Sequence, residues 1–301
     1  MSNLFQTSSS HWVKFSAYEL KKAKDGKEYV IPAPIAKPAV YDPLKDADAM
    51  VLDALNVGML QMKRANADAV RGSVMEFISK YGLLGFMTAL PTTPHFMDYD
   101  AAYLPKNHFI KDESMAVDAY AALFFPFEKP DFAKSKGAVH WNVSVDREMI
   151  ALAMTFNNAP LALNMSFQRE YAEPYDWLAT QFKDLAFTFV SSYLYYEDYD
   201  AIDETTRDLY RKGMAAFGGI APTYHIALLD KPTIVWDFYS LLLGTQMMFS
   251  FMLTDEAKPL RSCRHCQKAF MAGHPSAAFC SARCKNQYNV YKSRANKKNV
   301  D

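Results

Sequence analysis

The sequence predicts a mainly α-helical body with minor β structure, an α+β fold class, followed by a small C-terminal unit organised by four cysteines. Half of the 301 residues are hydrophobic, enough to build a sizeable core. Apolar residues recur at helical spacing through much of the chain before residue 254. All four cysteines fall between residues 263 and 284. We therefore divide the chain into a body, residues 1–257, and a C-terminal unit, residues 258–301.

The charges are divided unevenly between these two parts. Residues 258–301 contain ten Lys or Arg and one acid, a net charge of +9. Because the whole chain has 33 basic and 33 acidic residues, the body keeps 23 bases and 32 acids, a net charge of −9. This asymmetry predicts a tail that binds anions, either nucleic acid or an acidic protein face, including the body itself.

The start of the chain lacks the basic stretch and apolar run of a secretory signal. The one apolar segment of membrane length, residues 234–253, contains Asp237 and Gln246 and therefore favours a buried helix. We expect a cytoplasmic protein without a membrane segment, in which cysteines stay reduced and bind metal more readily than they form disulfides.

Local signals predict the elements of the body in chain order. Residues before about 40 are interpreted as irregular or extended, because prolines interrupt them. Asp42-Pro43 is the N-terminal signal of a first helix. A second helix is expected from Asn66 until Gly82, a glycine suited to a C-terminal cap.

The second half of the body carries weaker and then stronger patterns. Recurring prolines predict long loops between residues 91 and 136, with at most one short helix. Val143 and Val145 predict a short strand, and a helical pattern starts at Arg147. The later segments predict a central buried helix rich in aromatics at 175–196, a helix capped by Asp203 that ends at Gly218-Gly219, strands at 224–229 and 233–238, and a buried helix at 240–253.

The cysteines are spaced as C-x2-C, thirteen residues, and C-x3-C, at Cys263, Cys266, Cys280 and Cys284. Zinc prefers four tetrahedral ligands, and the first pair can share one metal through a tight turn, a knuckle. Ser281 is a good cap residue, which places Cys284 on the first turn of a helix. Knuckle, hairpin and helix describe a treble-clef-like finger with one structural zinc. Two disulfides or free thiols are the alternative.

The helix after Cys284 has two different sides when it is laid out at about 100° per residue. Cys284, Tyr288 and Tyr291 share one side, which we expect to pack on the zinc core. The opposite side carries a polar strip formed by Asn286, Asn289, Ser293 and Asn296. Cations flank this strip, with Arg283, Arg294 and Lys297 along one edge and Lys285 and Lys292 along the other.

This arrangement is typical of a helix that reads a nucleic-acid groove. Cations at the rims contact phosphates, and amides between them pair with adenine edges. The candidate nucleic-acid contacts are Arg283, Lys285, Asn286, Asn289, Lys292 and Arg294. A solvated basic helix without a partner fits the same pattern.

The run FCSARCKNQYNVYKSR resembles the C-terminal zinc finger named after its Cys-Gly-Asn-Arg signature, found in bacterial regulators of stress responses. The matching positions here are Cys284, Lys285, Asn286 and Gln287, so that glycine and arginine are both replaced. The upstream cysteine pair, followed closely by Phe270, also fits the family pattern. The similarity covers about the last forty residues and implies regulation through DNA binding.

A looser similarity concerns the body. The family's N-terminal domain has a helical segment that ends in a Gly-Leu turn, and Leu55-Asn56 and residues 81–85 are similar to it. We therefore expect a DNA-binding regulator whose acidic body binds a small ligand or a protein partner. The alternatives are an adaptor protein in which zinc is only structural and an enzyme with its site in the body. The sequence carries no phosphate loop, nucleophile elbow or H-E-x-x-H motif, so no catalytic residue is identified.

Overall fold

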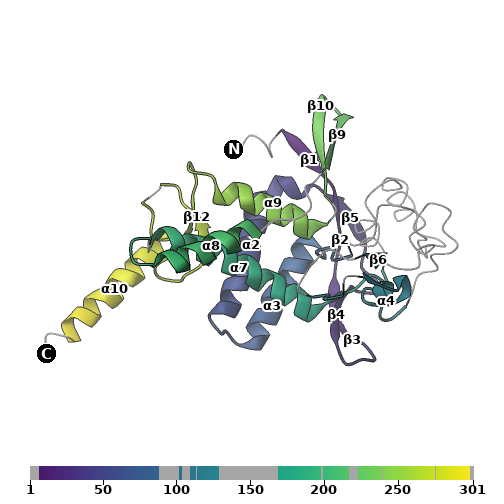
Figure 1. Ribbon diagram of the computed structural model, residues 1–301, viewed down its shortest axis with the longest axis horizontal. Helices are drawn as coiled ribbons and strands as arrows, with labels where there is room; N and C mark the ends of the chain where they lie inside the picture. The colour runs from purple at the N-terminus through teal and green to yellow at the C-terminus, as the bar shows by residue number, and fades with distance from the viewer. Residues whose placement is uncertain are drawn as a thin grey trace.

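The computed structural model describes residues 7–87, 102–103, 109–112, 114–128, 169–197, 199–216, 223–238, 240–274 and 276–298. The helical elements are η1 (Pro43–Asp46), α2 (Ala47–Met62), α3 (Ala67–Tyr81), α4 (Val117–Ala122), α7 (Tyr175–Glu197), α8 (Glu204–Ala216), α9 (Leu241–Leu253) and α10 (Ala282–Lys298) (Figure 1). The strands are short, which confirms the predicted mainly α class with minor β structure.

The N-terminal residues form five short strands: β1 (Ser8–Ser10), β2 (Trp12–Phe15), β3 (Tyr18–Lys22), β4 (Glu28–Pro32) and β5 (Pro38–Tyr41). The remaining strands are β6 (Ala102–Tyr103), β7 (Ser114–Met115), β8 (Glu173–Pro174), β9 (Thr223–Leu228), β10 (Pro232–Asp237), β11 (Leu260–Ser262) and β12 (Ala269–Met271). They pair in the orders β1-β10-β9, β2-β5, β3-β4-β8, β6-β7 and β11-β12. The N-terminal segment was predicted to be irregular or extended, and its strand pairing was not predicted, because β1 and β4 each pair with a strand far along the chain.

Side-chain caps form at the two positions where the sequence predicted helix starts. Asp42 accepts a hydrogen bond from the N–H of Leu44, and Asn66 accepts one from that of Asp68. Gly82 follows α3 with a φ of 91°, a left-handed conformation that favours glycine. The predicted strand around Val143, the helix from Arg147 and the helix end at Gly218-Gly219 lie outside the described residues.

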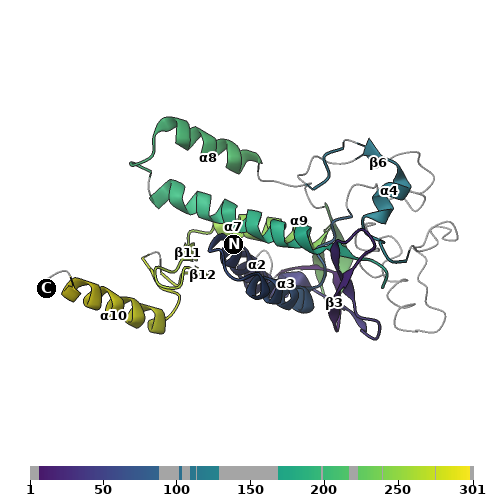
Figure 2. The same cartoon turned by 90° about the horizontal axis from the view of Figure 1, so that it is seen from below.

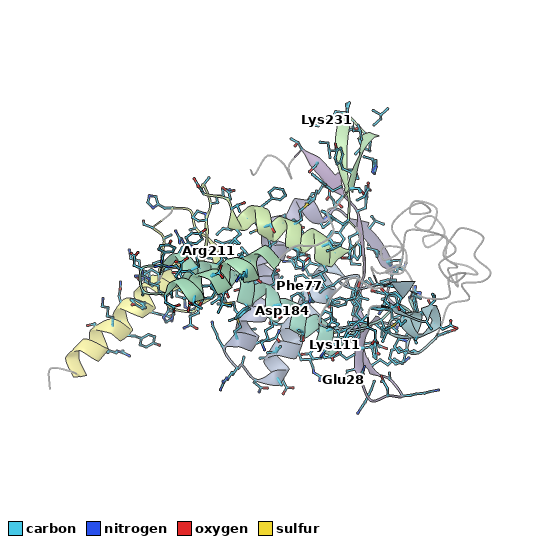
Figure 3. All side chains as sticks on the ribbon, in the orientation of Figure 1. Glu28, Phe77, Lys111, Asp184, Arg211 and Lys231 are labelled. Atoms are coloured by element: carbon cyan, nitrogen blue, oxygen red, sulfur yellow. The ribbon has the colours of Figure 1, made fainter. Side chains whose placement is uncertain are left out.

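Helix α2 is the centre of the body. It contacts α3, α7, α9 and β12, and the views in Figures 1 and 2 show it between these elements. Its buried residues point to several sides: Ala47, Met50, Val51, Ala54, Leu55, Val57, Gly58 and Met59. Phe77 of α3, labelled in Figure 3, and Phe182 of α7 meet with ring centroids 4.7 Å apart.

Helix α7 is buried along only part of its length. Leu178, Phe182 and Phe189 are buried, as predicted for an aromatic core helix. The prediction was wrong for Phe187 and Tyr196, which are 60% and 77% exposed. The C-terminal half of α7 extends beyond α2 and α3, so that it lacks their cover (Figure 2).

The turn after α3 is held by a buried carboxylate. Glu173 of β8 is 0% exposed and accepts hydrogen bonds from the backbone N–H groups of Leu84, Gly85 and Phe86, and from the Tyr171 hydroxyl. Burial raises the pKa of Glu173 to about 7, although the N–H donors favour the charged form and limit the rise. The segment that follows the predicted helix stop is therefore held by a residue nearly ninety positions away.

The predicted apolar segment 234–253 is divided between β10 and α9. Ser240 caps α9 by accepting a hydrogen bond from the N–H of Leu243 at 3.1 Å. Met248, Phe249 and Met252 of α9 are buried in the core. Within the described ranges, no helix has both the length and the apolar character to cross a membrane.

Candidate metal centre and basic helix

The first cysteine pair lies in the turn of the β11–β12 hairpin. The N–H of Cys263 donates to the carbonyl of Lys268 at 3.0 Å, and the N–H of Gln267 donates to the carbonyl of Cys263 at 2.7 Å. Gln267 has a φ of 58°, a left-handed conformation that a non-glycine residue seldom adopts. These bonds close a tight turn that brings Cys266 back toward Cys263.

The second pair is set by the start of α10. The Ser281 hydroxyl accepts a hydrogen bond from the N–H of Cys284 at 3.2 Å, the arrangement of an N-terminal cap. Cys280 therefore precedes the helix and Cys284 lies on its first turn, as the sequence predicted. The order of hairpin, loop and helix is that of a treble-clef-like finger.

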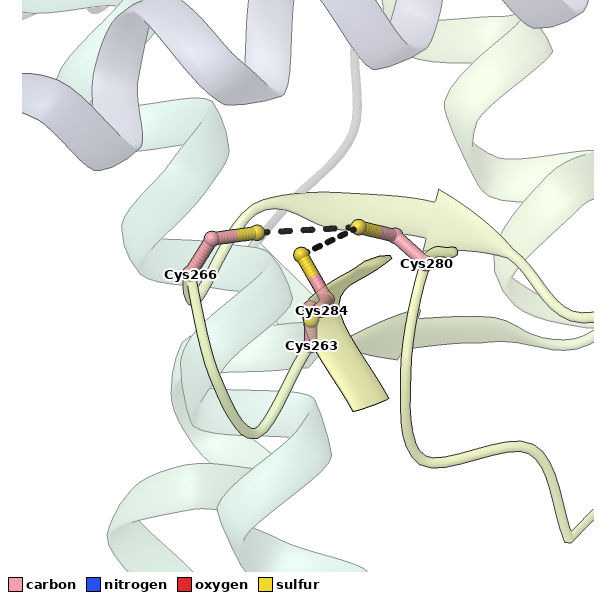
Figure 4. A group of neighbouring side chains, drawn as sticks. All are labelled: Cys263, Cys266, Cys280 and Cys284. Atoms are coloured by element: carbon pink, nitrogen blue, oxygen red, sulfur yellow. Dashed lines mark hydrogen bonds between the residues drawn. The ribbon is translucent and has the colours of Figure 1, made fainter. Parts of the chain in front are cut away.

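The four sulfur atoms lie within 4.8 Å of one another. The Sγ atoms of Cys266 and Cys280 are 3.6 Å apart, and those of Cys280 and Cys284 are 3.5 Å apart (Figure 4). Ligands around a tetrahedral metal with bonds of about 2.3 Å are separated by about 3.8 Å. All four cysteines are free, so the disulfide alternative is not realised. The cluster is compatible with one metal ion.

The thiols of the cluster differ in proton affinity. Burial disfavours the Cys263 thiolate, but N–H groups of Cys266, Cys280 and His265 donate to its sulfur and lower its pKa to about 6. Burial and the neighbouring sulfurs of Cys284, Cys266 and Cys263 raise the pKa of Cys280 to about 12. Four thiolates at this spacing repel one another, and a bound cation removes that repulsion.

The two sides of α10 differ in burial. Tyr288 is half-buried and packs on Phe279, with ring centroids 5.2 Å apart. The expectation that Tyr291 packs on the metal core was only partly right: its ring stacks on His265 at 5.7 Å but stays 58% exposed. Asn286, Asn289 and Ser293 of the polar strip are exposed. The side chains of Asn296 and Lys297 lie outside the described residues.

The candidate phosphate-binding cations, Arg283, Lys285, Lys292 and Arg294, are all exposed. None of them forms an ion pair within the part of the chain that the structure describes. Helix α10 projects away from the helical body in both views (Figures 1 and 2). Described acidic residues of the body therefore do not cover its cations.

Asn56 of α2 and Lys63, the residue that caps the C-terminus of α2, contact the finger, and sequence reasoning missed both roles. The Lys63 ammonium donates to the carbonyl of Cys266 at 2.6 Å, and the Asn56 side chain bonds the backbone of Ala269. In the sequence, Asn56 was noted only for the similarity of Leu55-Asn56 to the N-terminal domain of the Cys-Gly-Asn-Arg family. No sequence pattern indicated a role for Lys63. Their partners lie more than 200 positions away, so no local pattern could have revealed them.

Comparison with known proteins adds no relative, since no family model, no curated protein and no solved structure matches the chain. The Cys-Gly-Asn-Arg resemblance therefore stays a prediction. What the structure establishes is the close approach of Cys263, Cys266, Cys280 and Cys284 beside an exposed basic helix.

Proposed function

We propose that the four cysteines bind one structural zinc ion and that α10 of this finger binds DNA, which makes the chain a cytoplasmic zinc-finger regulator. The observation that carries the proposal is the exposure of the α10 cations and amides beside the cysteine cluster, on a helix that points away from the body. In this scheme the acidic body senses a small ligand or a protein partner.

The donor set supports zinc. Four thiolates at tetrahedral spacing are typical of structural zinc sites, whereas magnesium and calcium prefer oxygen ligands. Because four protein ligands complete a tetrahedron, no position is left open for a substrate or a catalytic water. The ion would supply folding energy to the finger by holding the knuckle of Cys263 and Cys266 against the start of α10.

Elemental analysis of the purified chain tests this part. We expect about one zinc per chain, lost on replacing Cys266 by Ser. Ser276→Ala, elsewhere in the finger and hydrogen-bonded to His274, serves as the control and keeps the metal. A chain purified under reducing conditions that contains no zinc contradicts the proposal.

The side chains of α10 support DNA as the ligand. Arg283 and Arg294 lie along one edge of the polar strip and Lys292 along the other, a spacing that lets cations contact phosphates on both sides of a groove. Asn286 and Asn289 lie between them, and carboxamides can bond both polar atoms of an adenine edge. A helix fits the major groove of DNA, whereas the deep groove of duplex RNA excludes it.

Fluorescence anisotropy with the full-length chain and mixed-sequence DNA duplexes tests DNA binding. We expect binding at low salt that weakens steeply as salt increases. Replacing Arg283, Lys285, Lys292 and Arg294 together by Ala should abolish it. Lys231→Ala, at the tip of the β9–β10 hairpin (labelled in Figure 3), is the control. Absence of binding to duplex DNA, single-stranded DNA and RNA would exclude the regulator proposal.

The alternative of an adaptor protein with purely structural zinc has its own support. Leu260 and Ala269 of the finger hairpin are part of the main hydrophobic core, so the finger also contributes buried side chains to the body. Exposed apolar side chains of β9, Tyr224, Ile226 and Leu228, lie on one side of an edge strand. A chain that contains zinc but binds no nucleic acid would favour this reading.

A further inference from the structure

Helix α2 and its C-terminal cap residue each present one polar side chain to the finger, Asn56 and Lys63. Asn56 and Lys63 are seven residues apart, about two helical turns, and therefore lie on the same side of the helix. Asn56 reaches Ala269 on β12, and Lys63 reaches Cys266 in the knuckle. One side of a body helix thus contacts both the base and the turn of the hairpin that carries the first two cysteines.

The hairpin register explains why Ala269 needs Asn56. The N–H of Cys263 donates to the carbonyl of Lys268, and hydrogen-bonded pairs alternate with non-bonded pairs along an antiparallel ladder. The next pair, Ser262 and Ala269, is therefore non-bonded, and the N–H and carbonyl of Ala269 point away from β11. Ala269 is 4% exposed, so water cannot satisfy them.

The carboxamide of Asn56 satisfies both groups. Its Oδ1 accepts from the N–H of Ala269 at 2.9 Å, and its Nδ2 donates to the carbonyl of Ala269 at 3.4 Å. Asn56 therefore acts on β12 as a neighbouring strand would. The two bonds fix the position of β12 along α2, and therefore also the position of the knuckle that precedes β12.

Lys63 holds the turn of the same hairpin. Its ammonium donates to the carbonyl of Cys266 at 2.6 Å, so it bonds the main chain of a cysteine whose sulfur belongs to the cluster. The following residue, Gln267, adopts a left-handed φ, so this peptide group is held in an unfavourable turn. A bond to its carbonyl restrains the turn in the conformation that directs the Cys266 sulfur toward Cys280.

We propose that Asn56 and Lys63 are positioning residues of the metal site, so that the body determines how firmly the finger keeps its metal. The inference rests on the proposed metal binding. It means that α2 preorganises the knuckle, and that the 44 residues after Ala257 do not reproduce the full site by themselves.

Metal release from the full-length chain tests the proposal. Asn56→Leu and Lys63→Met remove the bonds to the finger while they retain side-chain volume. Two matched control substitutions are on α2 and α3. Each removes a bond whose partner lies in the body and not in the finger. Gln61→Met removes a bond to the Ala179 carbonyl of α7. Lys80→Met removes an ion pair with Asp53, and Lys63 and Lys80 line the same cavity of about 330 Å³.

Each zinc-loaded protein is mixed with excess chromogenic chelator, and thermal unfolding is measured in parallel. We expect Asn56→Leu and Lys63→Met to release zinc about 10-fold to 100-fold faster than the unaltered chain. The two controls should release it at the unaltered rate, even where their unfolding midpoints fall. Cobalt(II) substitution should give a tetrahedral tetrathiolate spectrum that is perturbed in Lys63→Met and unchanged in Lys80→Met.

The outcomes separate this inference from the proposed function. If the unaltered chain holds no zinc, the proposed metal binding itself is wrong. An unaltered chain that holds zinc, with all four variants releasing it at one rate, overturns the positioning role. Release rates that follow the unfolding midpoints across all four variants also overturn it, because Asn56 and Lys63 would then act only through general stability.

Discussion

Gly58 of α2 lies directly against the main-chain carbonyl of Phe182 on α7, so close that a Cβ at this position would overlap it. The absence of a side chain lets the two helices approach. We expect Gly58→Ala to lower the free energy of unfolding by about 1–3 kcal/mol, because the helices must separate. The gain in helix propensity, about 1 kcal/mol, is too small to offset the overlap. Chemical denaturation of the full chain measures the difference.

The matched control is Gly72 on α3. A Cβ there meets no atom within 4 Å, and the residue is exposed. Gly72→Ala should therefore stabilise the chain by about 0.5–1 kcal/mol. Stabilisation by both substitutions would mean that α2 and α7 do not pack as described.

The stability of the body should depend on pH through Glu173. Burial raises its pKa from 4.5 to about 7, so between these values the folded state binds a proton that the unfolded state lacks. Stability therefore falls as the pH rises through this window, by at most about 1.4 kcal/mol per pH unit from this group. Tyr171 stays neutral here, because burial raises its pKa well above 10.

Glu173→Gln should remove this contribution. Denaturation of both proteins at several pH values between 4 and 8 isolates it, because other titrating groups affect both chains equally. Parallel pH profiles for Glu173→Gln and the unaltered chain would show that Glu173 is ionised throughout, held by the N–H groups of Leu84, Gly85 and Phe86.

The knuckle turn should favour glycine at position 267. Gln267 has a φ of 58°, and a left-handed conformation costs a non-glycine residue about 1–2 kcal/mol. We expect Gln267→Gly to slow zinc release, because it relieves this cost, and Gln267→Val to accelerate it, because a β-branched residue fits the conformation worst. Chelator competition measures both.

Arg64 provides the control for this prediction. It has a φ of 53° in the turn after α2, outside the finger. Arg64→Gly should raise the stability of the body and leave the zinc release rate unchanged. An equal effect of Arg64→Gly and Gln267→Gly on zinc release would show that the turn strain is not local to the finger.

Single substitutions on α10 should separate phosphate contacts from base contacts. Replacing Lys292 by Ala should weaken binding to all DNA sequences alike and reduce the slope of log affinity against log salt by about one unit. Replacing Asn289 by Ala should instead reduce discrimination between sequences, by about 1–3 kcal/mol at the affected base. Anisotropy titrations over a salt series measure both effects. Equal slopes for Lys292→Ala and the unaltered chain would rule out a phosphate contact there.

The sequence by itself determined the features that depend on neighbouring residues. The cysteine spacing and the cap at Ser281 were sufficient to predict the knuckle and the position of Cys284, because both depend on bonds within a few residues. The cap at Asp42 and the helix start at Asn66 were predicted for the same reason. Helical periodicity alone was sufficient to predict that Asn286, Asn289 and Ser293 share one side of α10, and this side is exposed.

Only the tertiary structure decided which elements meet. Sequence reasoning made α7 the central helix, whereas α2 holds that place because Gly58 admits α7 and the rest of its surface packs on α3, α9 and the finger. The bond between Asn56 and Ala269 joins residues 213 positions apart. Nothing in the chain near Asn56 marks such a partner, because the need for one arises from the buried hairpin edge that folding itself creates. The bond of Lys63 to Cys266 likewise joins residues 203 positions apart.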